Sequence, residues 1–183
     1  MKKILAFGAS NSKASINHQL AIWAANQIED VEVIEVRLDD YEMPLYSIDK
    51  ENENGIPALA RDFKNLVNES DGIIVSFAEH NGSYSVAFKN IYDWISRISK
   101  PIWGDKPMML LATSPGPRGG VTILNNAQEI LPHRGAIVSG VFSLPSFGTN
   151  FSDGIVGEEL IKKFRAQLDL FENAIMRGEK TLV

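Results

Sequence analysis

The sequence contains no cysteine, no surplus of basic residues and no long apolar run. The absence of cysteine excludes disulfides, thiol nucleophiles, and zinc or iron–sulfur sites held by cysteine. With 18 Lys and Arg residues against 23 Asp and Glu, the net charge is −5, so there is no basic excess to attract nucleic acid or an anionic membrane. No apolar stretch approaches the roughly 18 residues that span a bilayer. We therefore expect no nucleic-acid partner and no membrane span.

The chain has 183 residues and a mass of 20.2 kDa, which predicts one domain over residues 1–183. A domain of this size buries enough apolar surface to fold without a metal or disulfide. The apolar opening reaches Gly8, Ser10 and Asn11 too early for the core of a signal peptide. The sequence therefore predicts a cytoplasmic protein.

Short apolar runs alternate with segments of helical periodicity along the whole chain. The runs predict five strands, at Lys3–Phe7, Val31–Val36, Gly72–Phe77, Met108–Ala112 and Ala136–Phe142. The periodic segments predict five helices, at Ile16–Ile28, Ile56–Val67, Val86–Ile98, Gly120–Leu131 and Gly157–Met176. The acidic, irregular segment Asp39–Gly55 is predicted to be a long loop.

The predicted strands are apolar almost throughout, which is typical of a parallel sheet covered on both faces. Strict alternation with helices indicates an α/β three-layer sandwich with right-handed crossovers. Five strands of this kind favour the flavodoxin-like order 2-1-3-4-5. In open α/β sheets the ligand binds beyond the carboxyl ends of the strands, where the strand order reverses. We therefore expect the site in the loops after the first, third and fourth strands.

The first of these loops, Gly8–Asn17, carries three hydroxyls and two amides at the start of a helix. Unpaired backbone N–H groups and the positive end of the helix dipole make such a turn suitable for a phosphate. It matches neither a Rossmann nor a Walker A pattern. The alternative interpretation is that Ser15 or Asn17 only caps the helix.

The other two loops have the chemistry of a site for a flat heteroaromatic ligand. Ala78–Ser85 brings together an acid, an imidazole, an amide and a tyrosine. Thr113–Gly120 has three glycines, which let a backbone approach a ligand plane closely. The alternatives are an ordinary polar loop, in which Ser85 caps the next helix, and a plain turn. The three histidines are far apart and form neither a metal-ligand spacing nor part of a catalytic triad.

Three motifs in these loops resemble those of the NAD(P)H-dependent FMN reductase family, which includes quinone, azo-dye and chromate reductases. The family pattern Gly-Ser-x-Arg-x-x-Ser-x-Asn is matched at Ser10, Ser15 and Asn17, with Ser12 in place of the arginine. The Pro-Glu-Tyr-Asn pattern is retained at Glu79 and Asn81, with Ala78 and His80 as departures; the helix pattern that follows is matched from Phe88 to Trp94. The pattern Ser-x-Gly-x-x-Gly-Gly is intact at Ser114, Gly116, Gly119 and Gly120.

This resemblance implies an FMN site with two parts. Four residues would hold the phosphate: Ser10, Ser12, Ser15 and Asn17, with Ile16 between the last two. The other implied residues would line the isoalloxazine ring: Glu79, His80, Asn81, Gly82 and Ser83 on one side, and Ser114, Gly116, Gly119 and Gly120 on the other.

The resemblance also implies an activity and partners. NADPH or NADH would deliver a hydride to flavin N5, and a small electron acceptor such as a quinone or free flavin would then be reduced. No side chain is required as a catalytic acid or base, and no metal is expected. Family members are typically homodimers or homotetramers. Two other hypotheses remain open: a flavin-binding electron carrier or sensor, and a flavodoxin-like scaffold without FMN.

Overall fold

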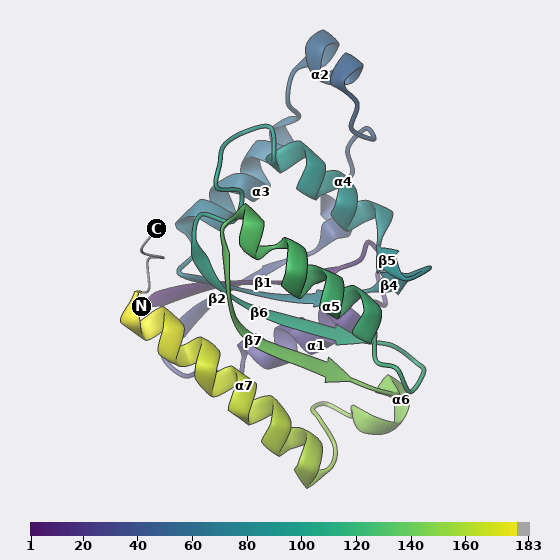
Figure 1. Cartoon of the computed structure of the whole chain (residues 1–183), viewed down its shortest axis with the longest axis vertical. Coiled ribbons are helices and arrows are strands. Elements are labelled where there is room, and N and C mark those ends of the chain that lie inside the picture. Colours follow the sequence, from purple (N-terminus) through teal and green to yellow (C-terminus); the bar gives the residue numbers. More distant parts are fainter. Residues whose placement is uncertain (179–183) are drawn as a thin grey trace.

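The computed structural model describes residues 1–178, and its centre is a five-stranded parallel sheet (Figure 1). The strands lie in the order β2-β1-β3-β6-β7, which confirms the predicted flavodoxin-like order. Every neighbouring pair in this sheet is parallel. The strand bounds are β1 (Lys2–Ala9), β2 (Val31–Val36), β3 (Gly72–Phe77), β6 (Lys106–Thr113) and β7 (Ala136–Leu144).

Helices cover both faces of the sheet, as predicted for a three-layer sandwich (Figure 1). On one face lie α1 (Ile16–Ala25) and α7 (Glu158–Arg177). On the other face lie α3 (Ala58–Glu69), α4 (Val86–Ile95) and α5 (Val121–Ile130). Because neighbouring side chains of a strand point to opposite faces, strands that are apolar throughout supply both cores.

Strand β1 shows how one short run serves the two cores. Leu5 and Phe7 are fully buried and belong to the core that includes Phe63 of α3. Ile4 and Ala6 are equally buried but belong to the core that includes Leu20 of α1. This packing on both faces holds β1 inside the sheet, between β2 and β3, so the loop that follows β1 lies beside the loop after β3 at the carboxyl edge.

Helices α1 and α4 end three residues before their predicted limits, at Ala25 and Ile95. After each end, backbone hydrogen bonds join residues three apart rather than four apart, as between the Ile28 N–H and the Ala25 carbonyl. The chain therefore continues as a tighter turn, in which apolar residues keep a nearly helical spacing. Hydrophobic periodicity alone does not distinguish this tighter turn from a further turn of α-helix.

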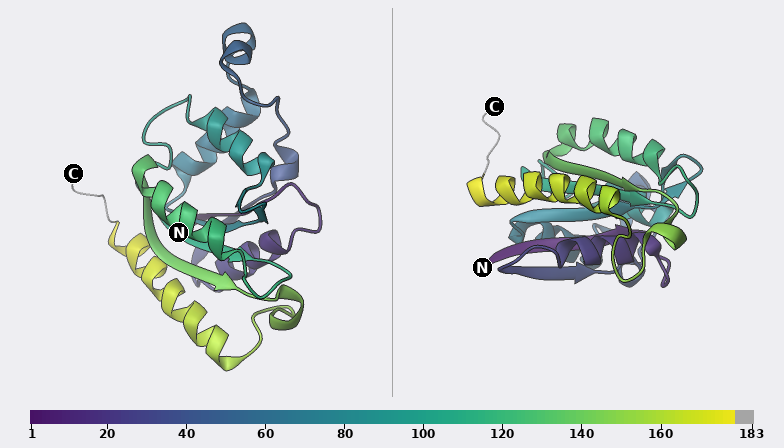
Figure 2. Two further views of the ribbon diagram at one scale, coloured as in Figure 1. Left: turned by 45° about the vertical axis from the view of Figure 1, so that its right-hand side comes forward. Right: turned by 90° about the horizontal axis from the view of Figure 1, so that it is seen from below.

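The prediction of a long loop at Asp39–Gly55 was wrong in part. This segment contains the short 3₁₀ helix η1 (Leu38–Asp40) at its start and α2 (Ile48–Asn54) near its end. Ser47 caps α2 by accepting the Lys50 N–H, at 3.2 Å. No residue of α2 is buried, so the helix has no apolar stripe by which its sequence could be recognised. Figures 1 and 2 show α2 standing away from the rest of the fold.

The prediction of a plain loop at Ala78–Ser85 was also wrong in part, because a small hairpin lies within it. Strands β4 (Glu79–His80) and β5 (Ser83–Tyr84) pair antiparallel. Asn81 and Gly82 join them with φ of 53° and 73°. Two consecutive residues with positive φ make a type I′ turn, for which Asn-Gly is the preferred sequence. The four-residue helix α6 (Phe147–Asn150) was not predicted either.

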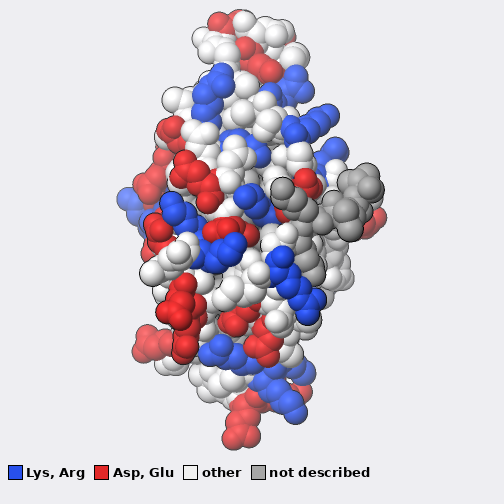
Figure 3. Space-filling model, turned by 90° about the vertical axis from the view of Figure 1, so that its left-hand side faces the viewer, with Lys and Arg blue, Asp and Glu red and all other residues white. Residues whose placement is uncertain are grey.

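The end of the molecule at which the strands begin carries charges of both signs (Figure 3). Lysine and arginine side chains lie among aspartate and glutamate side chains across this face. A mixed surface produces no extended field of one sign that would attract a charged ligand. Within residues 1–178, no helix has both the length and the hydrophobicity required to cross a membrane.

Candidate functional site

The loops after β1, β3 and β6 meet at the carboxyl edge of the sheet and enclose a cavity of about 220 Å³. This is the edge at which the fold class predicts a ligand. Eight of the predicted residues line the cavity: Ser10, Ser12, Ser15, Ile16, Asn17, Glu79, His80 and Ser114. The other predicted residues belong to the same loops without lining it: Asn81, Gly82, Ser83, Gly116, Gly119 and Gly120.

The start of α1 gives this cavity the character of an anion site. Ser15 is the N-cap residue, and its hydroxyl oxygen accepts the His18 N–H at 3.1 Å. The N–H groups of Ile16 and Asn17 have no acceptor among the described residues. Unpaired N–H groups at the positive end of a helix dipole stabilise a bound phosphate. Ser15 therefore caps the helix, as the alternative interpretation expected, and its hydroxyl hydrogen remains able to donate to a ligand.

The side chain of Asn17 points into the protein rather than toward a ligand. Its amide oxygen accepts from the Ser76 hydroxyl at 2.7 Å and from the Thr113 N–H at 3.0 Å. Its amide nitrogen donates to the Thr113 carbonyl at 3.1 Å. Asn17 thus joins α1 to the ends of β3 and β6, and its backbone N–H is the group that faces an anion.

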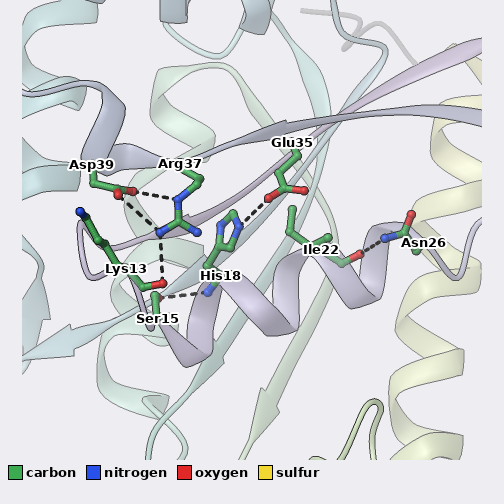
Figure 4. A network of polar contacts seen from close by, with 8 residues as sticks. All are labelled: Lys13, Ser15, His18, Ile22, Asn26, Glu35, Arg37 and Asp39. Atoms are coloured by element: carbon green, nitrogen blue, oxygen red, sulfur yellow. Dashed lines mark hydrogen bonds and ion pairs between the residues drawn. The ribbon is translucent and has the colours of Figure 1, made fainter.

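The loop between β1 and α1 is held in place by Arg37, the residue that follows β2 (Figure 4). The Arg37 guanidinium donates to the Lys13 carbonyl at 3.2 Å and pairs with Asp39 at 3.1 Å. Within the loop, the Ser12 N–H donates to the Ser10 hydroxyl at 3.2 Å. Neither Arg37 nor Lys13 lines the cavity, so the polar groups that the start of α1 presents there are N–H groups and hydroxyls; we call this part of the cavity, formed by Ser10, Ser12, Ser15, Ile16 and Asn17, the cradle.

The hairpin after β3 connects the cradle to the start of α5. The Glu79 carboxylate accepts the Ile123 N–H at 3.1 Å, so it caps a helix whose own N-cap is a glycine. Tyr84 lies with its ring 5.6 Å from Phe77, and burial raises the pKa of its hydroxyl. His80 is exposed at the tip of β4, on the rim of the cavity. Of these side chains, His80 is the one free to meet a flat ligand.

Two of the three glycines of the third loop are required by close packing. Gly119 and Gly120 are buried, with φ of 58° and 71°, in the left-handed region that favours glycine. A Cβ at Gly119 would clash with the Ser143 hydroxyl, which donates to the Gly119 carbonyl at 2.9 Å. The loop is braced from β7 and the segment after it, since the Ser146 N–H donates to the Gly116 carbonyl.

Four lining residues were not predicted from the sequence: Ala14, Ala78, Thr113 and Pro115. Thr113 is the last residue of β6, and its hydroxyl donates to the Leu144 carbonyl at 2.7 Å. Its position at the carboxyl end of a strand was the signal that could have identified it. Ala14 and Pro115 offer no polar side chain, so only the geometry of the loops shows that they line the cavity.

The three loops and the strand order agree with one family of proteins. Residues 2–149 match the family described as NADPH-dependent FMN reductase. The chain belongs to this family. This confirms the resemblance seen in the loop motifs, and it assigns the chain to a family of oxidoreductases that use FMN and NAD(P)H.

Two relatives of this chain are named as a quinone reductase and an azoreductase. The Escherichia coli (strain K12) quinone reductase is 30% identical over 97 residues, which cover 53% of this chain and 52% of that protein. The NADPH azoreductase of Bacillus sp. (strain OY1-2) is 25% identical over 183 residues, with 93% of this chain and 94% of that protein covered. The matched segment therefore spans only about half of the first of these relatives.

Among solved structures, the flavoenzyme NAD(P)H:(acceptor) oxidoreductase FerB from Paracoccus denitrificans has the same fold. It superposes with a TM-score of 0.77 over 97% of this chain and 99% of that chain, at 23% identity. At this level of identity the match confirms the flavodoxin-like fold alone.

Proposed function

We propose that this protein binds FMN at the carboxyl edge of its sheet and transfers reducing equivalents from NAD(P)H to a small quinone-like acceptor. The observation that carries the proposal is the cradle at α1, where the free N–H groups of Ile16 and Asn17 lie beside the hydroxyls of Ser10, Ser12 and Ser15. Family membership and the relatives named as quinone reductases support the choice of cofactor and acceptor.

The residues present fit FMN. The cavity beside α1 offers hydrogen-bond donors to a phosphate, and its walls are the hairpin and the glycine-rich loop. From the glycine-rich loop, Thr113, Ser114 and Pro115 line the cavity, and the left-handed backbone at Gly119 and Gly120 lets this loop turn into α5. FMN, when bound, supplies the ring that accepts and returns a hydride.

The chain itself positions the reactants. Asn17 and Ser85 fix the starts of α1 and α4 against the strand ends, because the Ser85 hydroxyl donates to the Ala9 carbonyl at 2.7 Å and Asn17 binds Thr113. Glu79 fixes the hairpin against α5. The overall reaction consumes one NAD(P)H, one proton and one quinone, and it yields NAD(P)⁺ and the hydroquinone.

The proposal is tested by loading the purified protein with FMN and adding NADPH and NADH, separately, without oxygen. We expect the flavin absorbance near 450 nm to bleach within seconds with at least one donor, since family members use the cofactor in turnover. Adding a quinone should then restore the absorbance. A flavin that binds but stays oxidised with both donors would contradict the proposal and favour an electron carrier or sensor.

Replacing Ser12 by arginine should tighten FMN binding. Ser12 lines the cradle at the position where the family pattern has arginine, and a guanidinium would add charge-assisted hydrogen bonds to the phosphate. A gain of about 1.5 kcal/mol or more corresponds to roughly a tenfold lower Kd, measured by quenching of flavin fluorescence. Ser12→Gln, long but neutral, should leave the Kd within about twofold of wild type. Equal effects of both variants would show that charge is not what the site lacks.

The predictions of a homodimer or homotetramer and of a cytoplasmic location remain part of this proposal. Both rest on the resemblance and composition given above. Sedimentation of the purified protein measures the first directly, and a single monomeric species at micromolar concentration would contradict it.

A further inference from the structure

A second cavity, of about 520 Å³, lies beside the phosphate cradle on the β2 side of the sheet. The two cavities share His80, and Asn11 of the second lies in the chain between Ser10 and Ser12 of the first. Its walls come from the segment after β2 and from the start of α4. A molecule bound there would therefore adjoin any ligand that occupies the cradle and the hairpin.

The lining of this cavity combines apolar side chains with polar ones, among them Asn11 and His80, and a single acidic side chain. Tyr41, Met43 and Leu45 line one wall, and Val86 lies opposite. Leu45 and Val86 are 59% and 69% exposed, so apolar surface faces solvent at the mouth. Covering this surface with an apolar ligand is favourable, because it removes apolar area from water.

Glu42 is the acidic side chain of the lining. Among the described residues that form the cavity, none is lysine or arginine. Burial raises the pKa of the neighbouring Tyr41, and the negative charges of Asp62 and Asp40 raise it further. The negative charge of Glu42 disfavours an anion in the cavity, and the Lys50 ammonium, which donates to the Leu45 carbonyl at 3.1 Å, offsets part of this charge.

The wall that carries Glu42 is fixed rather than loose. Asn90 donates to the carbonyls of Met43 and Pro44, each at 3.2 Å, and accepts the Tyr46 N–H at 2.9 Å. The Trp94 indole donates to the Pro44 carbonyl at 2.8 Å. Since the backbone that follows Glu42 is bonded to α4, the chain at Glu42 is held beside the cavity, and its side chain is exposed there.

We propose that this cavity is the acceptor site and that Glu42 makes it selective for uncharged quinones over anionic acceptors, such as sulfonated quinones and flavin nucleotides. The inference rests on the proposed function and adds the location and charge selectivity of the acceptor site.

The experiment compares 1,4-naphthoquinone with 1,4-naphthoquinone-2-sulfonate. For the FMN-loaded wild type, Glu42→Gln and Glu42→Lys, the ratio of kcat/KM for the neutral quinone to that for the sulfonate is measured at low salt. Because the two quinones differ in intrinsic reactivity, the change of this ratio between variants is the readout. We expect the ratio to fall at least threefold in Glu42→Gln and about tenfold in Glu42→Lys, and the effect to shrink at high salt.

Glu53→Lys is the matched control. Glu53 is an exposed carboxylate of α2 that is not part of the cavity lining, so the same charge change should leave the ratio unchanged. A ratio that changes equally in both variants would show an effect of net charge and overturn the assignment of Glu42.

Equilibrium dialysis of the sulfonate against FMN-free protein supplies a readout without turnover. Its Kd should fall at least threefold in Glu42→Lys and stay at the wild-type value in Glu53→Lys. If both quinones are reduced but neither the ratio nor the Kd responds to Glu42→Lys, this inference is wrong while the proposed function stands. If no variant reduces either quinone, the proposed function fails, and dialysis still decides whether the cavity discriminates by charge.

Discussion

Asn17→Ala is expected to lower the free energy of unfolding by about 3 kcal/mol or more. The side chain is 3% exposed and makes three hydrogen bonds, to the Ser76 hydroxyl and to both backbone groups of Thr113. Alanine would leave these buried groups without their partner, at about 1–3 kcal/mol each in the absence of replacement water. Denaturant unfolding followed by tryptophan fluorescence measures the loss.

The matched control for this prediction is Asn26→Ala at the other end of α1. The Asn26 amide donates to the Ile22 carbonyl at 3.0 Å, but this bond is exposed to solvent (Figure 4). Water replaces such a bond readily, so the expected loss is below about 0.5 kcal/mol. Equal stabilities of the two variants would mean that Asn17 does not join the helix to the strand ends. The same comparison separates this role from phosphate binding, because a surface-facing Asn17 would affect FMN affinity but hardly stability.

Gly119→Ala is expected to cost about 3 kcal/mol of stability and to weaken FMN binding at the same time. A residue with a Cβ pays about 1–2 kcal/mol for the left-handed conformation that Gly119 adopts. The added carbon would also contact the Ser143 hydroxyl and lie 3.0 Å from the carbonyl of Leu144, which is backbone and cannot move aside cheaply. Relief of the clash requires the loop to shift away from β7, and thus from its place at the site.

Gly116→Ala is the control within the same loop. Its φ lies outside the positive range, and a Cβ there would meet nothing within 4 Å. We expect its unfolding free energy to stay within about 0.5 kcal/mol of wild type. Thermal unfolding of both variants, with and without FMN, provides the comparison. Equal stabilities of Gly119→Ala and Gly116→Ala would contradict the conclusion that the loop packs closely against β7 at Gly119.

The parts of the fold that bury apolar surface were predictable from the sequence. Strands β2 and β3 have the predicted bounds, because each is rich in Val and Ile and is preceded by an aspartate, Asp30 and Asp71. Helix α2 could not be found in this way, since it buries nothing and depends on capping by Ser47. The β4–β5 hairpin had a readable signal in Asn81 and Gly82, and the polar composition of the segment obscured it.

The candidate site was predictable as a set of loops, but not in the roles of individual side chains. The family resemblance implied that Asn17 and Glu79 face a ligand, whereas the structure engages Asn17 with Thr113 and Glu79 with the start of α5. An inward and an outward asparagine have the same place in a motif, so only the three-dimensional contacts distinguish them. The acceptor cavity was likewise hidden, because Glu42 and its neighbours lie in a segment predicted to be an irregular loop.

The central claim is that the start of α1 holds the phosphate of FMN, and amide NMR of the ¹⁵N-labelled protein tests it most directly. FMN and riboflavin, which lacks the phosphate, are titrated to matched saturation. The N–H resonances of Ile16 and Asn17, which have no acceptor among the described residues, should move strongly with FMN and little with riboflavin. Resonances that stay in place when FMN binds, or that move equally with both ligands, would contradict the account.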